Sequence, residues 1–193
     1  ESKIVREGLH RAIEACAAME IPCLLIPTFV KSEITNQDEW DDAVEVFKWA
    51  CDAAGEDNVT VAAENTFSAA DTRRFLADID KPNLRVYFDT QNYYLHKEYN
   101  TPALLDELMD VVCEIHVKDG KAKDLSGALL GHGDTNFSGS IEVMKKRGYS
   151  GWIVSENYYD QKPLSEQSSD VAALLKEDLN TLKVALGQAP VGR

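Results

Sequence analysis

The sequence predicts an α/β fold with a parallel sheet. Apolar segments rich in β-branched and aromatic residues alternate with segments whose apolar residues recur at helical spacing. The strand segments are almost continuously apolar, which is typical of strands covered by helices. The last residues of four successive strand segments are separated by 25, 27 and 40 positions. These separations are long enough for the helical crossover that parallel strands require. Strand and helix therefore alternate as in a parallel α/β protein.

Five segments have the composition of buried strands. They are expected at residues 21–28, 59–64, 84–89, 111–116 and 151–156. In the first of them Pro22 and Pro27 lie near the two ends, where a missing backbone N–H costs no ladder bond. A closed eight-stranded barrel typically needs ~250 residues, so this chain is about three βα units short of one.

Six helices are expected from apolar periodicity and end signals. They cover residues 5–20, 40–55, 68–76, 101–109, 141–146 and 171–186. Gly55 suits the end of the second helix, Ser68 opens the third, and Thr101-Pro102 places a proline in the first turn of the fourth. A long loop, 118–137, follows the fourth strand, and the polar segment 161–170 is interpreted as a linker.

Composition and charge limit the class of protein. One domain spanning residues 1–193 is expected, since this length can bury a sizeable core. The formal net charge of −13 disfavours a nucleic-acid partner, because such binding depends on Lys and Arg neutralising phosphates. Neither a membrane-spanning stretch nor a secretory signal is recognised, so a cytoplasmic protein without a membrane partner is expected. Four cysteines without CxxC spacing are interpreted as buried thiols: Cys16, Cys23, Cys51 and Cys113.

Residues of metal-ligand type end four of the five strands. They are Glu64, Asp89, His116 and Glu156. The carboxyl ends of parallel strands meet at one edge of a sheet, so these side chains are expected to converge. Two Glu, one Asp and one His make a mixed O/N site suited to one divalent ion such as Mn²⁺, Mg²⁺, Co²⁺ or Zn²⁺. Each could instead be an ordinary polar strand end, an interpretation that weakens when all four occur together.

Five short motifs, in this order and spacing, resemble one known family. They are 63–65 (Ala-Glu-Asn), 88–90 (Phe-Asp-Thr), 115–119 (Ile-His-Val-Lys-Asp), 131–134 (Gly-His-Gly-Asp) and 148–156. The chain resembles the sugar phosphate isomerase/epimerase family of xylose isomerase-like TIM barrels, which includes D-tagatose 3-epimerase and L-xylulose 5-phosphate 3-epimerase. The resemblance covers essentially the whole chain. It implies a TIM (β/α)8 barrel of that type, of which residues 1–193 form five C-terminal βα units, with the first three strands missing.

The resemblance also implies roles for individual residues. In that family the last four strands end in Glu, Asp, His and Glu, which bind one divalent metal, and these match Glu64, Asp89, His116 and Glu156. Four further residues are expected near the substrate: Asn92, Lys118, Asp119 and His132. Asn92 stands where many relatives have His, and His132 lies in a loop that often reads Gly-Glu-Gly. The alternatives are a solvated Lys118 and a loop-fixing His132.

These features predict a metal-dependent isomerase or epimerase of a sugar or sugar phosphate. Epimerising a ketose removes a proton beside the carbonyl and returns it to the other face, which needs two bases, and Glu64 and Glu156 fit. The metal would chelate the carbonyl and hydroxyl oxygens and stabilise an enediolate. An aldose–ketose isomerase would use the same ligands. The alternatives are an endonuclease IV-like phosphodiesterase, which Asn92 and the acidic charge disfavour, and an inactive barrel fragment that serves as a binding module.

The strand count also predicts uncovered sheet edges. Five parallel strands cannot close a barrel, so the strands at 21–28 and 151–156 would each leave one edge unpaired. Exposed edges invite pairing with other chains. We therefore expect the sequence, which begins at Glu1 within a helical pattern, to be part of a longer ~270-residue enzyme, or a second chain to cover the edges in a homo-oligomer.

Overall fold

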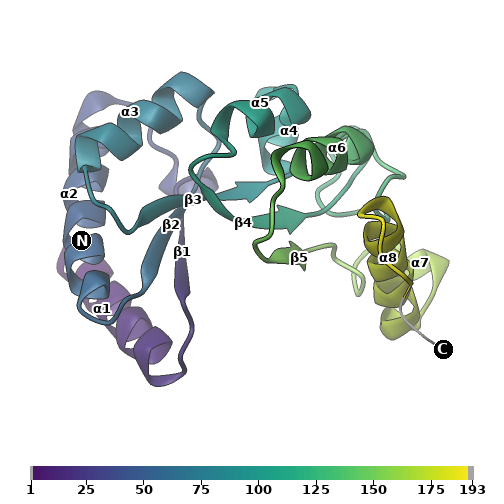
Figure 1. Ribbon diagram of the computed structural model, residues 1–193, viewed down its shortest axis with the longest axis horizontal. Coiled ribbons are helices and arrows are strands. Elements are labelled where there is room, and N and C mark those ends of the chain that lie inside the picture. The colour runs from purple at the N-terminus through teal and green to yellow at the C-terminus, as the bar shows by residue number, and fades with distance from the viewer. Residues whose placement is uncertain (1, 191–193) are drawn as a thin grey trace. The chain divides into compact units, whose positions relative to one another are not determined.

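Residues 2–190 are described by a computed structural model (Figure 1). Five strands form one parallel sheet, ordered as they occur in the chain. They are β1 (Cys23–Pro27), β2 (Thr60–Glu64), β3 (Leu84–Asp89), β4 (Val112–Val117) and β5 (Ile153–Ser155). This confirms the predicted α/β fold and all five strands. The described residues thus contain three strands fewer than a complete eight-stranded barrel.

Six helices match the predicted ones. They are α1 (Ser2–Ala18), α2 (Gln37–Gly55), α3 (Ala69–Ile79), α5 (Thr101–Leu108), α6 (Phe137–Arg147) and α8 (Val171–Ala185). Three short elements were not predicted, because they are too short to show a period: η1 (Val30–Ser32), α4 (Asn92–Lys97) and α7 (Leu164–Gln167). The interpretation of 161–170 as a mere polar linker was therefore wrong, since α7 lies within it and buries Leu164 completely.

Side-chain caps explain where several helices begin. In each case a side-chain oxygen accepts a hydrogen bond from the backbone N–H three residues further on, which satisfies an otherwise unpaired donor. The capping residues are Asn36 for α2, Ser68 for α3, Asn100 for α5 and Asp170 for α8. These caps fix where the four helices begin.

The chain divides into two compact units, one ending at Tyr87 and the other beginning at Phe88. In the first unit α2 packs against β2, α1 and α3. Its core contains Phe75, whose ring centroid lies 5.2 Å from that of Trp40 and 5.1 Å from that of Phe47. In the second unit α5 packs against α6 and β4 against β5. A buried apolar cluster there joins α8 to the loop after β4.

The structure tests two further predictions, one about the cysteines and one about membrane-spanning helices. Among the described residues no cysteine forms a disulfide, and Cys16 and Cys51 are buried as predicted. Cys23 and Cys113 are only half-buried, so the prediction of a buried thiol was wrong for these two residues. Between residues 2 and 190 no helix combines the length and apolar character needed to cross a bilayer.

The aromatic cluster of the first unit gives a stability prediction. Truncating Phe75 to Ala leaves a cavity between Trp40 and Phe47, so the free energy of unfolding should fall by about 3–5 kcal/mol. Urea denaturation followed by far-UV circular dichroism measures this loss. Ile4→Ala is the control, because Ile4 is 78% exposed on α1 and should change stability little. Equal stability of the two variants would contradict this packing.

Candidate metal centre

The four predicted ligand residues lie at or beside strand ends. Glu64 and Asp89 are the last residues of β2 and β3, His116 is the next-to-last residue of β4, and Glu156 follows β5 directly. One ligand atom from each side chain lies within 4.8 Å of those from the other three. Glu64 and Asp89 are buried, whereas His116 and Glu156 are half-buried. Within the second unit, Asp89, His116 and Glu156 therefore lie together as the sequence predicts, and Glu64 is the fourth member of this candidate ligand group.

Asp89 is oriented by the backbone that follows it. Its Oδ1 accepts hydrogen bonds from the backbone N–H groups of Gln91 and Asn92, both at 2.7 Å. This turn directs the other oxygen, Oδ2, toward His116, whose Nδ1 lies 3.8 Å away. One carboxylate oxygen is thus fixed by the chain, and the other faces the cluster.

Thr90 holds the end of β3 beside the end of β4. Its backbone N–H donates to the His116 carbonyl at 3.0 Å, and its Oγ1 donates to the Lys118 carbonyl at 3.1 Å. The same Oγ1 accepts from the Lys118 backbone N–H at 3.2 Å. Since Asp89 precedes Thr90, these bonds set the spacing between Asp89 and His116.

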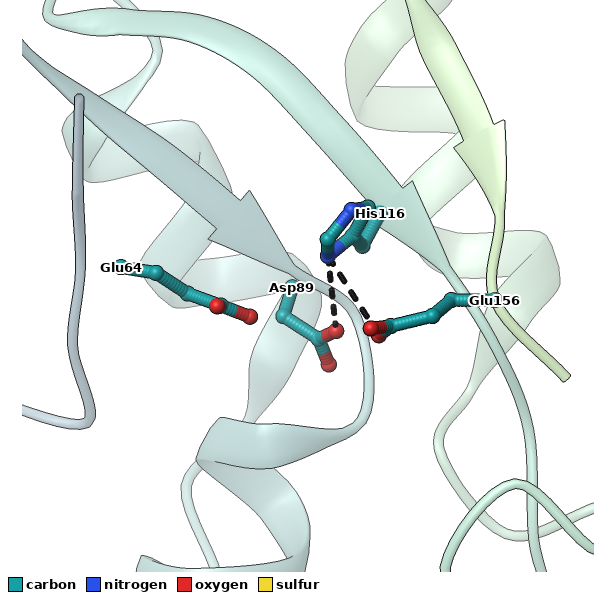
Figure 2. Close-up of side chains that lie close together, drawn as sticks. All are labelled: Glu64, Asp89, His116 and Glu156. Carbon is teal, nitrogen blue, oxygen red and sulfur yellow. Dashed lines mark ion pairs between the residues drawn. The ribbon is translucent and has the colours of Figure 1, made fainter. Parts of the chain in front are cut away.

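His116 lies between two carboxylates of the cluster. Figure 2 shows its ion pairs with Asp89 and Glu156, and Nδ1 is 3.3 Å from Glu156 Oε2. The backbone N–H of Glu156 donates to the Val117 carbonyl at 3.0 Å, which places Glu156 beside the end of β4. Parallel pairing of His116 with Val154 and of Val117 with Ser155 sets this position.

Lys118 is buried within the same cluster. The residue is 3% exposed, and its Nζ lies 2.6 Å from Glu156 Oε2 and 3.0 Å from Asp89 Oδ2. Burial lowers the pKa of Lys118, but the carboxylates of Asp89 and Glu156 outweigh this and hold the pKa above its usual range. The alternative of a solvated lysine was therefore wrong. The charged ammonium neutralises part of the repulsion between the carboxylates.

The donor set fits one divalent cation. Glu64, Asp89 and Glu156 carry three negative charges when ionised, and Lys118 supplies one positive charge, which leaves two negative charges. Carboxylate oxygens with one imidazole nitrogen suit Mn²⁺, Zn²⁺ and related ions. Both the local charge and the ligand types therefore match the ion that the sequence predicts.

Asp119 organises the loop between β4 and α6. Its Oδ2 accepts from the backbone N–H groups of Gly131 and Gly133 at 3.0 and 2.9 Å. Its Oδ1 accepts from Gly120 and from the backbone and hydroxyl of Thr135. Gly131 has φ +81°, and a Cβ on Gly133 would collide with the Asp119 carboxylate. The carboxylate of Asp119 is thus directed into its own loop, so a substrate contact by Asp119 stays an untested prediction.

The other two predicted substrate residues lie in different settings. Asn92 is buried at the start of α4, and its backbone N–H donates a hydrogen bond to the Asp89 carboxylate. His132 is exposed and faces a cavity of about 430 Å³, whose lining includes Lys121 and Glu177. Asn92 therefore lies beside the cluster, whereas His132 belongs to a separate cavity.

The sequence interpretation missed two residues that shape the cluster. Thr90 holds Asp89 beside the end of β4, and Gln91 binds the loop after β4 through the Ser126 backbone N–H and the Asp124 carbonyl. Both are buried polar residues directly after Asp89. Their signal was present in the sequence, because a polar run after a buried strand needs hydrogen-bond partners.

The chain belongs to the xylose isomerase-like TIM barrel family, whose model matches residues 1–183. A relative from Actinoplanes sp., 2-epi-5-epi-valiolone 7-phosphate 2-epimerase, is 27% identical over 145 residues. That match covers 74% of this chain and 53% of the relative, so the chain spans about half of the length of that protein.

Two solved structures show the same fold. An L-ribulose 3-epimerase superposes with a TM-score of 0.77 at 17% identity, covering 95% of this chain and 67% of the other. The IolI protein with a bound zinc atom gives a TM-score of 0.74 at 12% identity, covering 94% and 68%. At these identities the likeness establishes the fold and confirms the predicted family architecture.

Replacing the buried ammonium tests its part in the cluster. Lys118→Met leaves the carboxylates of Asp89 and Glu156 without their counter-charge, so the metal-free chain should lose about 3–5 kcal/mol of stability. Saturating Mn²⁺ should restore more stability to this variant than to the parent chain. Urea denaturation with EDTA or Mn²⁺ measures both effects. Lys123→Met, at an exposed lysine, is the control. An Mn²⁺ effect of equal size in all three proteins would show that Lys118 does not serve the cluster.

The Asp119 loop gives a second prediction. Asp119→Asn replaces one acceptor oxygen by an NH₂ group, which faces backbone donors and cannot bond them. The amides that met the replaced oxygen, either those of Gly131 and Gly133 or those of Gly120 and Thr135, should then exchange with deuterium at least tenfold faster, a loss of about 1.4 kcal/mol of local protection. Hydrogen exchange read by NMR checks this, with the exposed Asp160→Asn as control. Unchanged exchange at all four amides would refute the role given to Asp119.

Proposed function

We propose that this chain carries the metal and proton-transfer residues of an isomerase or epimerase that acts on a ketose or its phosphate. The observation that carries the proposal is the gathering of two Glu, one Asp and one His, with charge suited to a divalent ion, in a xylose isomerase-like TIM barrel. The Actinoplanes relative, whose name is that of a 2-epimerase of a 7-phosphate compound, supports the reaction class.

Four residues would hold the ion: Glu64, Asp89, His116 and Glu156. When bound, a divalent ion would act as a Lewis acid that polarises the substrate carbonyl. The chain supplies the fixed geometry for this. Asp89 is held by two backbone N–H groups, and Glu156 by its backbone bond to the Val117 carbonyl.

Glu64 and Glu156 are assigned as the two bases. The reaction needs one carboxylate to take the proton from the carbon beside the carbonyl and another to return a proton to the opposite face. Glu64 ends β2, and Glu156 follows β5, so β3 and β4 lie between their strands in the sheet. Carboxylates from separate strands suit attack on the two faces of one carbon.

Lys118 is assigned a substrate contact as well as a counter-charge. An ammonium carries three N–H donors, and two of these meet Glu156 and Asp89. The third would donate to a substrate oxygen that becomes negative as the proton leaves, and so would favour that proton transfer. Asn92, buried beside Asp89, is assigned a second contact to a substrate hydroxyl.

The proposal is tested by metal content and isotope exchange together. The purified chain should contain one divalent ion, and Asp89→Ala should lose it, as measured by inductively coupled plasma mass spectrometry. In D₂O the protein should place deuterium on the carbon beside the carbonyl of a ketose from a panel of free and phosphorylated sugars. Glu156→Gln should lower this rate by about 10²–10⁴-fold, and Glu142→Gln, on an exposed side chain of α6, should not.

Two results would contradict the proposal. Full metal content in Asp89→Ala would remove Asp89 from the ligand set. Cleavage of abasic DNA, with no exchange into any ketose of the panel, would instead favour a phosphodiesterase.

A further inference from the structure

Helix α8 buries a carboxylate that the proposed proton transfer does not use. Asp178 is 0% exposed, on the face of the helix that also buries Leu174 and Leu182. Burial raises the pKa of Asp178, and hydrogen bonds from its neighbours offset part of that rise. An ionisable group in such a place costs several kcal/mol unless its hydrogen bonds are well made. The bonds that Asp178 makes therefore indicate what it does.

Three donors meet the two oxygens of Asp178. Oδ1 accepts from the backbone N–H of Leu130 at 2.8 Å. Oδ2 accepts from Asn157 Nδ2 at 2.7 Å and from the Tyr159 hydroxyl at 2.8 Å. One donor belongs to the loop after β4 and two to the segment after β5. A single carboxylate on α8 therefore binds both segments.

The two side-chain donors hold the residues on either side of Glu156. Asn157 directly follows Glu156, and Ser155 directly precedes it. The Tyr159 hydroxyl lies 2.6 Å from the Oγ of Ser155. Asp178 is thus connected to both neighbours of Glu156, to one directly and to the other through Tyr159. Motion of the Glu156 backbone would break bonds on both sides.

Asn157 extends the connection toward Lys118 and Asp119. Its Nδ2 also donates to the Ala128 carbonyl at 2.9 Å, and its Oδ1 accepts from the Asp119 backbone N–H at 3.0 Å. The amide of Asn157 therefore uses both donors and one acceptor, which leaves little freedom to rotate. The backbone segments that carry Lys118 and Glu156 are therefore held to each other. Lys118 Nζ lies 2.6 Å from Glu156 Oε2.

We propose that Asp178 is a positioning residue, which fixes the Glu156 carboxylate at the metal site by holding Asn157 and Tyr159. This inference rests on the proposed function, because its consequence is the affinity for the divalent ion. Residues that orient metal ligands from outside typically change metal affinity by 10–100-fold when they are altered. Asp178 lies on α8, and its carboxylate meets Leu130, Asn157 and Tyr159, so it would act on the site through these residues.

Asp178→Asn is the direct test. An Asn side chain has one acceptor oxygen and one NH₂ group, so either orientation places NH₂ against a donor that Asp178 now binds. Glu177→Gln is the matched control, because Glu177 is the exposed neighbour on the same helix. The readouts are Co²⁺ affinity from absorption titration of the metal-free chain, the shape of the Co²⁺ spectrum, and urea unfolding of the same sample.

We expect Asp178→Asn to bind Co²⁺ about 10–100-fold more weakly with an altered spectrum, and Glu177→Gln to match the parent chain. A role confined to folding would lower stability but leave the affinity of the folded protein unchanged. That result would overturn the inference while the proposed metal site stands. A parent chain that binds no Co²⁺ would overturn the proposed function and this inference together.

Tyr159→Phe covers the case in which Asp178→Asn does not fold. It removes one hydroxyl from the network and keeps the ring. Loss of one hydrogen bond predicts Co²⁺ affinity about two- to tenfold weaker, with the folded state retained. Parent-like affinity in folded Tyr159→Phe would overturn the inference.

Discussion

The repulsion among carboxylates at one edge of the sheet is the constraint on which the rest of this structure depends. Two unit charges about 4 Å apart interact by roughly 4 kcal/mol at an effective dielectric constant of about 20, so like charges need compensation. Within the second unit, Lys118 lies between Asp89 and Glu156 and supplies one positive charge. Two negative charges remain when Glu64 is included, and a divalent ion would balance them. The buried lysine and the proposed ion are therefore parts of one electrostatic arrangement.

Backbone donors and buried polar side chains hold these charges in place. Thr90 holds Asp89 beside β4, while Asp119 closes the long loop after β4. Asp178 connects that loop to the chain around Glu156. Such bonds cost little conformational entropy during a reaction, because they are made before substrate binds. The buried carboxylates of Asp119 and Asp178 bind the long loop between β4 and α6 at several points.

The sequence predicted the sheet and the candidate ligand group at the strand ends because both follow from local rules. Strands that are continuously apolar, or that alternate apolar and polar residues, can be recognised in the sequence itself. Parallel strands then bring their carboxyl ends to one edge of the sheet. What could not be predicted depends on contacts across long separations. Asp178 lies 48 residues from Leu130 in sequence, and a lone acid on an apolar helix face gives no local sign of its partners. A solvated position was favoured over a substrate contact for Lys118, since only the fold shows the two carboxylates beside it.

The central claim is that one divalent ion binds where these four side chains converge. Crystals of the chain grown with Zn²⁺ and measured at the zinc absorption edge test it most directly. The account predicts a single anomalous peak about 2.0–2.2 Å from a His116 nitrogen and from carboxylate oxygens of Asp89, Glu156 and Glu64. Ordered side chains at these positions without a peak, or a peak held by other residues, would contradict it.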